Sequence, residues 1–308
     1  MLLRFILSYN CFMEAEINMF TDYLHDCREK SENTIVSYHS DLIRLKNFME
    51  KQGITDVKRM TSTHLNSYLF YLEKNGFSAA TISRSIASLR AFYRYLRREG
   101  LVREEACGLL QRPKAERKLP EILTPEETAR LLEQPSGDLP KEIRDKAMLE
   151  LLYATGIRVT ELICLKQEDV NLQVGYIICR EEGRERRERV IPFGKSAQKA
   201  LERYLEEGRA AMTDERTEYL FVNCLGKPMS RQGFWKLVKR YAERAGISMA
   251  ITPQTLRHSF AAHLLANGAD LKSVQEMLGH SELSSTQVYA AVNQNKRREI
   301  YAKAHPRA

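Results

Sequence analysis

The sequence has few cysteines, and they lack the spacing of a metal site. There is no C-x-x-C pair and no paired histidine spacing near the cysteines, which are Cys11, Cys27, Cys107, Cys164, Cys179 and Cys224. Such scatter argues against bound zinc, and it fits a reducing compartment in which thiols stay free. We therefore expect a cytoplasmic protein without a metal.

Long apolar runs are missing as well. No stretch approaches the ~18 apolar residues of a transmembrane helix, and charged residues make up 29% of the chain, so we do not expect a membrane protein. The apolar start MLLRFILSYNCF shows no small-residue cleavage site and is followed at once by acidic residues. We interpret it as the product of an upstream start codon, with Met13 rather than Met1 as the natural first residue. A membrane-touching tail is the alternative.

Positive charge is in excess. Lys and Arg number 48 against 40 Asp and Glu, which gives a net charge of +8 and a pI near 9.1. A basic balance of this size suits an anionic partner, most often nucleic acid. The length of 308 residues and a hydrophobic fraction of 43% suffice for two domains of ordinary size.

Helical periodicity dominates residues 13–110. Apolar side chains fall on one face, and a glycine ends the pattern, in TIVSYHSDLIRLKNFMEKQG, TSTHLNSYLFYLEKNG and SAATISRSIASLRAFYRYLRREG. With a first helix around residues 15–27, these segments predict an N-terminal domain of four helices joined by short turns.

The polar face of the fourth helix carries an arginine stripe, which consists of Arg84, Arg90, Arg94, Arg97 and Arg98. A solvated face usually mixes its charges, so this stripe favours phosphate contacts over simple hydration. The next segment, QRPKAERKLPEIL, has two prolines and four basic residues, including Arg112 and Lys114. It predicts an exposed linker over residues 111–122 that follows DNA.

Residues 123–308 predict a second domain in which helices again dominate. Thr124, Pro125 and Glu127 form a helix start with a capping box. The segment GYIICREEGRERRERVIPFG has two β-rich runs around a charged loop, which predicts a hairpin, and EYLFVN is a candidate third strand. The expected fold is mainly α, with two domains, of which the second is mixed α/β with a small sheet.

Two arginines are candidates for phosphate binding. In YATGIRVTEL, Arg158 starts a helix and Glu161 shares its face; the alternative is an exposed ion pair worth a few tenths of a kcal/mol. In TPQTLRHSFAAH, Arg257 lies beside an apolar stripe and suits phosphate, which a guanidinium binds through two parallel hydrogen bonds. Structural hydrogen bonds explain the neighbouring His258 and His263 equally well.

Two further candidates lie near the C-terminus. His280 follows Gly279 at the end of a helix, and Tyr289 lies in the short apolar run of HSELSSTQVYAAV. A capping box of Ser284 and Gln287 holds the tyrosine's helix. Taken alone, Tyr289 is better explained as a packing residue than as a nucleophile.

Together these motifs resemble the tyrosine recombinase (phage integrase) family, and within it the Xer branch. The resemblance rests on RDKAMLELLYATGIRVTEL, on LRHSFAAHLLANGADLKSVQEMLGHSELSSTQVY and on the terminal HPRA, and it extends from Met13 to Ala308. The spaced Arg, Leu-Arg-His, Leu-Gly-His and Tyr set is highly specific.

The resemblance implies a SAM-like core-binding domain over residues 13–110 and a catalytic domain over residues 123–308. Tyr289 would attack a DNA phosphodiester and form a 3′-phosphotyrosyl link, on the way to a Holliday junction. Arg158 and Arg257 would bind the phosphate oxygens, His280 would hydrogen-bond the same phosphate, and Glu161 would orient Arg158. No cofactor or ATP would be needed, because the bond energy is kept.

Two positions depart from the family pattern. The family has a hairpin lysine that acts as general acid, but residues 176–194 contain no lysine, and Arg184 takes the equivalent position when RVIPFG is the anchor. Arginine remains charged and is a poor proton donor. The usual histidine three residues before Arg257 is Gln254, which can donate a hydrogen bond but cannot carry a proton.

The resemblance leaves several functions open. A recombinase that resolves chromosome or plasmid dimers competes with a mobile-element integrase and with a DNA-binding accessory paralogue that cleaves weakly. A type IB topoisomerase fits the two-domain layout less well. The expected partners are a double-stranded recombination site, a second copy or a paralogue in a tetramer on DNA, and a DNA translocase as a regulator.

The C-terminal segment NQNKRREIYAKAHPRA is basic and helix-prone, and in the family this segment docks on a neighbouring protomer. Deleting residues 296–308 should therefore spare binding to a single half-site and impair cooperative binding to a paired site. Gel-shift titrations on single and paired sites measure both quantities. Unchanged cooperativity would assign the segment to a solvated tail.

Overall fold

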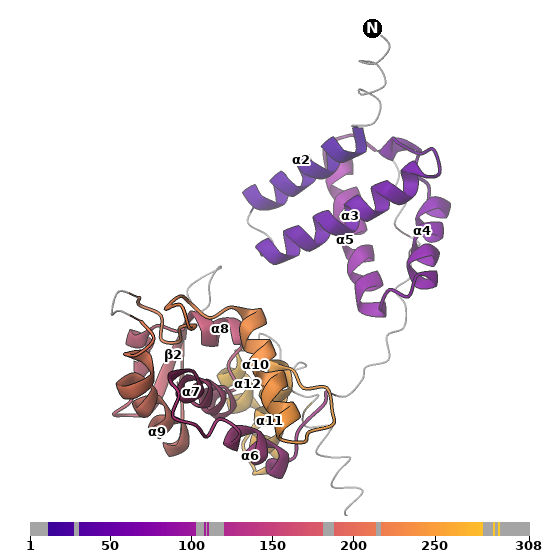
Figure 1. Ribbon diagram of the computed structural model, residues 1–308. Coiled ribbons are helices and arrows are strands. Elements are labelled where there is room, and N and C mark those ends of the chain that lie inside the picture. Colours follow the sequence, from indigo (N-terminus) through magenta and orange to yellow (C-terminus); the bar gives the residue numbers. More distant parts are fainter. Residues whose placement is uncertain are drawn as a thin grey trace, which may run out of the picture. The chain divides into compact units, whose positions relative to one another are not determined.

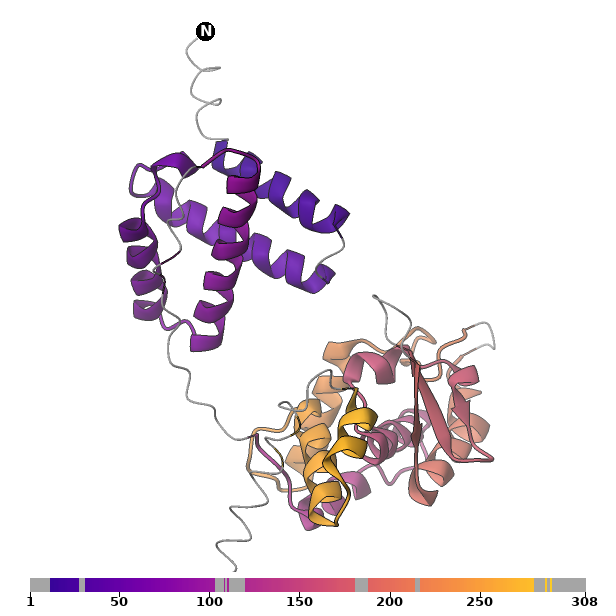
Figure 2. The ribbon, with the colours of Figure 1, turned by 180° about the vertical axis from the view of Figure 1, so that it is seen from behind.

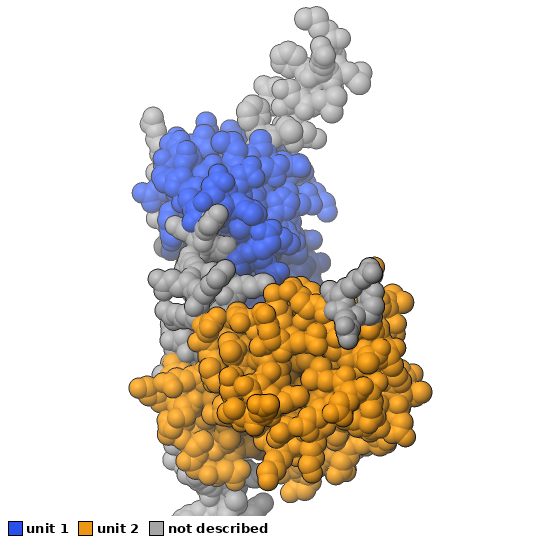
Figure 3. Space-filling view, turned by 90° about the vertical axis from the view of Figure 1, so that its left-hand side faces the viewer, with its two compact units in different colours: residues 1–117 blue, residues 118–308 orange. Residues whose placement is uncertain are grey.

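The computed structural model describes residues 12–27, 31–102, 108, 110, 120–180, 188–213, 217–279, 286 and 289. The chain divides into two compact units, Met1–Arg117 and Lys118–Ala308 (Figure 3). In the part of the chain that the structure describes, the fold is mainly helical with one small sheet in the second unit, as the sequence predicts. Among the residues described, no helix is long and apolar enough to cross a membrane.

The described residues of the first unit form α-helices and one 3-10 turn. They are α2 (Phe12–Asp26), α3 (Glu32–Glu50), η1 (Val57–Arg59), α4 (Ser62–Lys74) and α5 (Ala79–Arg98) (Figure 1). Hydroxyl side chains start two of them, because Thr61 Oγ1 accepts from His64 N and Ser78 Oγ accepts from Thr81 N. Buried Phe20, Tyr68 and Phe92 lie in the core that α2, α3, α4 and α5 share.

Part of the arginine stripe supports this unit. Arg84 donates two hydrogen bonds, of 2.8 and 3.0 Å, to the buried carboxylate of Asp41 on α3. Arg90 Nη2 donates to the carbonyl of Leu110 at 2.7 Å. Arg98 lies over the ring of Tyr23, with its Cζ 3.9 Å from the centroid. Arg94 and Arg97 are exposed, while Arg112 and Lys114 lie outside the described residues. The phosphate role of the stripe stays a prediction.

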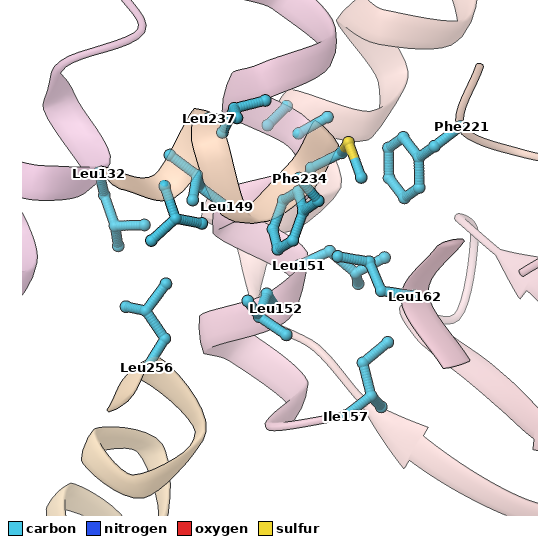
Figure 4. Close-up of a cluster of buried hydrophobic side chains, with 14 of the residues drawn as sticks. Leu132, Leu149, Leu151, Leu152, Ile157, Leu162, Phe221, Phe234, Leu237 and Leu256 are labelled. Atoms are coloured by element: carbon cyan, nitrogen blue, oxygen red, sulfur yellow. The ribbon is translucent and has the colours of Figure 1, made fainter. Parts of the chain in front are cut away.

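The second unit surrounds one central helix. Its elements are α6 (Pro125–Glu133), α7 (Pro140–Thr155), α8 (Val159–Cys164), η2 (Gln167–Asp169), β1 (Val170–Asn171), β2 (Tyr176–Arg180), β3 (Glu188–Pro192), α9 (Lys195–Arg203), the π-helical turn η3 (Tyr204–Arg209), α10 (Arg231–Arg244), α11 (Pro253–Ala266) and α12 (Leu271–Leu278). Helix α7 contacts α6, α8, α9, η3 and α11. Figure 4 shows leucines of α7 meeting apolar side chains from α8, α10 and α11.

The sheet is antiparallel with the order β1-β2-β3, and Ile177 pairs with Ile191. The predicted hairpin is confirmed as β2 and β3, but its loop, which contains Arg184, lies outside the described residues. The prediction of a strand at EYLFVN is wrong. Tyr219 and Val222 form only isolated bridges, with Lys166 and Pro228, and the strand beside β2 is β1.

Leu123 lies near the start of the second unit, and side chains of α11 bind both its backbone N–H and its carbonyl. Leu123 N donates to Ser259 Oγ at 2.9 Å, and His263 Nε2 lies 2.9 Å from Leu123 O. The other ring nitrogen of His263 lies 2.8 Å from the hydroxyl of Tyr153 on α7. His263 is thus a structural histidine that joins the chain entry, α7 and α11.

Candidate active site

A glycine shapes the turn that leads to Arg158. Gly156 ends α7 with φ +60°, a conformation that L-residues adopt only with strain. A side chain here would also overlap the ring of Phe260 on α11, with its Cβ 2.6 Å from Cε1. The Gly156 carbonyl accepts a 2.6 Å hydrogen bond from Arg257 Nη1, so one residue both turns the chain and holds an arginine.

Arg158 precedes α8 and is held by Glu161 through two contacts. Glu161 Oε2 accepts from Arg158 N at 2.6 Å, and Glu161 Oε1 accepts from Arg158 Nη1 at 3.1 Å. The pair differs from the fully exposed ion pair of the alternative explanation, because the Glu161 side chain is only 10% exposed, although that of Arg158 is 39% exposed. Burial alone would raise the pKa of Glu161, but hydrogen bonds and charge from Arg189 and Arg158 hold it below its usual value.

Arg257 is buried on α11, with 6% of its surface exposed. Burial, followed by the charge of Arg158, lowers its pKa to about 10. The guanidinium therefore still carries its charge at neutral pH. The local environment penalises that charge, and an anion placed beside Arg257 would relieve the penalty.

The end of α12 binds three arginines through consecutive carbonyl groups. Met277 O accepts from Arg189 Nε at 3.0 Å, Leu278 O from Arg257 Nη2 at 2.5 Å, and Gly279 O from Arg158 Nη2 at 2.8 Å. The last carbonyls of a helix lack partners within it and carry the negative end of its dipole. Helix α12 thus brings together arginines from the start of α8, from β3 and from α11, and Figure 2 shows it beside α11.

Tyr289 lies among these elements with 5% of its surface exposed, against Phe260, Val274 and Leu278. Its ring meets that of His258 edge to face, with 5.4 Å between the centroids. Burial raises the pKa of the Tyr289 phenol above its ordinary value, and the charge of Arg257 opposes that rise. The tyrosine packs as the first interpretation expected, and it also reaches a pocket.

That pocket has a volume of about 740 Å³, and its lining includes Arg158, Gln254, Arg257 and Tyr289. Candidates that lie up to 131 residues apart in the sequence (289 − 158) thus share one cavity. His280 and Arg184 lie outside the described residues. No group of three or more possible metal ligands occurs in the described part of the chain.

Sequence reasoning missed residues on two other elements. Arg231, Gln232 and Trp235, at the start of α10, also line the pocket, and the indole is 45% exposed. Arg189 on β3 joins Glu161 and α12 with only 14% of its side chain exposed. Strand alternation contained this signal, because Arg189 has the same parity as buried Ile191 and so faces the core.

Gly156→Ala should destabilise the second unit more than Gly246→Ala. Both glycines have positive φ, +60° and +66°, but nothing lies within 4 Å of a Cβ at Gly246. Each variant should lose about 1–2 kcal/mol to the left-handed backbone, and overlap with Phe260 should add about 1–3 kcal/mol at Gly156. Urea unfolding followed by Trp235, the only tryptophan, reports on this unit. Equal losses of stability in the two variants would show that Phe260 moves aside without a free-energy cost.

Comparison with known proteins agrees with this geometry. Residues 121–296 match the phage integrase family, and residues 17–100 match the phage integrase N-terminal SAM-like domain. Tyrosine recombinase XerD of Halalkalibacterium halodurans is 43% identical over 301 residues, which cover 96% of this chain and 100% of the relative.

Solved structures of recombinases share the fold. The crystal structure of XerA recombinase is 29% identical, with a TM-score of 0.54 over 96% of this chain and 100% of that one. XerH site-specific recombinase bound to a palindromic difH substrate, in a post-cleavage complex, is 23% identical, with a TM-score of 0.76 over 94% of this chain and 85% of that one. The extent of these matches, together with the two family domains in order, shows that this chain belongs to the phage integrase family of tyrosine recombinases.

Proposed function

We propose that this protein is a site-specific recombinase that cuts and rejoins DNA through a covalent link to Tyr289. One observation carries the proposal: the pocket of about 740 Å³ is lined by Arg158, Arg257 and Tyr289. Two cations beside a buried phenol suit a phosphodiester, because guanidinium groups bind phosphate oxygens through paired hydrogen bonds. The XerD relative and the XerH complex support DNA as the substrate.

The reaction needs no external energy source. The phenol oxygen of Tyr289 attacks phosphorus, the bond to the 5′-oxygen breaks, and a 3′-phosphotyrosyl link and a 5′-hydroxyl result. Arg158 and Arg257 stabilise negative charge on the non-bridging oxygens as it develops. The phosphodiester energy is retained in the protein–DNA link, so the 5′-hydroxyl of another strand can reverse the step and complete an exchange.

Three further residues have proposed roles in this reaction. His280 follows Gly279 directly and would hydrogen-bond the same phosphate. Gln254 is exposed on α11 and lines the pocket, where its amide can donate a hydrogen bond but no proton. Arg184, in the hairpin loop, would stabilise the leaving 5′-oxygen by its charge.

DNA binding is assigned to both units. We place the core-binding domain at residues 13–110, the basic linker at 111–122 and the catalytic domain at 123–308. Phosphate contacts are expected at Arg94 and Arg97, at Arg112 and Lys114, and at any N–H that Arg84 and Arg90 leave to solvent. Each phosphate contact adds to the salt dependence of binding by counterion release.

The biological role we favour is Xer-type resolution of chromosome or plasmid dimers in the cytoplasm. The near full-length match to XerD supports it. A Holliday junction requires four active sites, so the protein would act as a tetramer with copies of itself or with a paralogue, and a DNA translocase is a candidate regulator. A weakly cleaving accessory paralogue is the second candidate, because residues 176–194 contain no lysine.

A suicide substrate tests the proposed chemistry directly. A nick next to the cleavage position lets the released fragment diffuse away, which traps the covalent complex. The wild type should form an adduct that survives denaturing electrophoresis, and Tyr289→Phe should form none although it still shifts DNA in a native gel. A wild type that binds the site but forms no adduct would leave only the accessory role.

A sulfur-substituted substrate tests the hairpin. A 5′-bridging phosphorothiolate releases a thiolate, which needs no proton, and general acid catalysis typically contributes ~10²–10⁴-fold. This protein should therefore gain more from the substitution than a lysine-bearing relative does. Arg184→Lys should speed cleavage of the normal substrate and shrink the gain. Equal rates on both substrates would show that another acid is at work or that chemistry is not the slow step.

A further inference from the structure

Arg189 is a mostly buried arginine beside Glu161, and the reaction as proposed does not use it. Its Nη2 donates to Glu161 Oε2 at 2.7 Å, and its Nε donates to Met277 O at 3.0 Å. The guanidinium also lies against Gly279, where a Cβ would come within 3.0 Å of Cζ. One side chain on β3 thereby touches both structures that hold Arg158, namely the Glu161 carboxylate and the end of α12.

We propose that Arg189 is a positioning residue for the phosphate-binding arginines. This role rests on the function proposed above. Arg189 holds Glu161 against Arg158, and it also fixes the end of α12. That end of α12 binds Arg257 and precedes His280. The side chain is only 14% exposed and is directed at protein oxygens. It therefore acts through Arg158 and Arg257 and does not touch the DNA.

The charges around Glu161 make this role measurable. Arg158 faces the carboxylate from the start of its own helix, Arg189 from β3 and Arg257 from α11, while Cys179 lies near it on β2. Burial raises the pKa of the Cys179 thiol to about 12, so this thiol adds no charge at neutral pH. Among the cations that lower the pKa of Glu161, Arg189 has the largest effect.

Removal of Arg189 changes the protonation of Glu161 in a definite direction. In the wild type the cations hold its pKa low, so the carboxylate stays ionised and accepts from Arg158 throughout a range from pH 5 upward. Without Arg189, burial is less opposed and the pKa of Glu161 rises. As the pH falls through that raised value, Glu161 gains a proton, loses its charge and releases Arg158.

The experiment is single-turnover cleavage of the suicide substrate with saturating protein, over about pH 5 to 8.5. Arg189→Met should slow cleavage on the order of 10- to 100-fold, as loss of a supporting contact or a small misplacement of reacting groups does. It should also add a limb in which the rate falls towards acid pH. Arg180→Met is the matched control on the same hairpin, since Arg180 is 43% exposed and pairs with Glu168, Asp169 and Glu188; it should keep the wild-type profile.

A conservative variant and a double variant separate positioning from stability. Arg189→Lys keeps the charge but cannot span both oxygens, so its cleavage should be slower without the acidic limb. Glu161→Gln has no carboxylate to titrate, so adding Arg189→Met to it should produce no acidic limb. Thermal melting and native gel shifts establish that each variant folds and binds DNA. If Arg189→Met does not fold, Arg189→Lys is the test variant. Cleavage by Arg189→Lys at the wild-type rate would then overturn the positioning role.

The outcomes distinguish this role from the function on which it rests. A wild type without adduct overturns the proposed function and the Arg189 role together. A wild type that cleaves, beside an Arg189→Met variant with the same rate and pH profile, overturns the Arg189 role alone. Arg189→Met should be slowed equally on normal and sulfur-substituted DNA; rescue by sulfur would place Arg189 at the leaving group and overturn the positioning role.

Discussion

The contact on which the site depends is that between the carbonyl end of α12 and three guanidinium groups. Arg158, Arg189 and Arg257 repel one another, and the carboxylate of Glu161 accepts hydrogen bonds from both Arg158 and Arg189. Backbone dipoles add to this compensation, because consecutive carbonyls at the end of α12 each accept from a different arginine. Dipoles stabilise a cation without neutralising it, so the pocket keeps a positive potential. An anion is the partner that such a potential favours.

Glycines make this arrangement possible at two helix ends. Gly156 ends α7 and Gly279 ends α12, both with positive φ, and each directs its carbonyl at an arginine from a different element. Residues with side chains would strain both turns, and at Gly156 would also displace Phe260. The backbone geometry that terminates these helices is therefore the same geometry that positions the guanidinium groups.

Much of this could be predicted from local sequence, because helix starts and ends are local. The capping box at Thr124, the glycine at position 156 and the pairing of Arg158 with Glu161 all depend on residues within one turn. The Arg84–Asp41 and Arg189–Glu161 contacts could not be predicted in the same way, since they join residues 43 and 28 positions apart. The prediction for the arginine stripe depends on charge alone, and charge does not show that Arg84 and Arg90 have protein partners. The prediction of a strand at EYLFVN is wrong for a similar reason, because a β-rich composition does not determine whether a neighbouring strand is available for pairing.

The burial of Tyr289 bears on when the positive charge would act in the proposed reaction. Burial raises the pKa of its phenol more than Arg257 lowers it, so the phenol of Tyr289 is protonated at neutral pH. The arginines therefore do not work by storing a phenolate in the empty site. Once a phosphate occupies the pocket, its charge offsets part of theirs, which makes a free phenolate still less favourable. In the reaction proposed above, the phenol would lose its proton as it attacks phosphorus, when charge moves onto the oxygens that Arg158 and Arg257 would bind. Their stabilisation is greatest at that point, and this is the condition for accelerating a reaction rather than tightening the binding of its substrate.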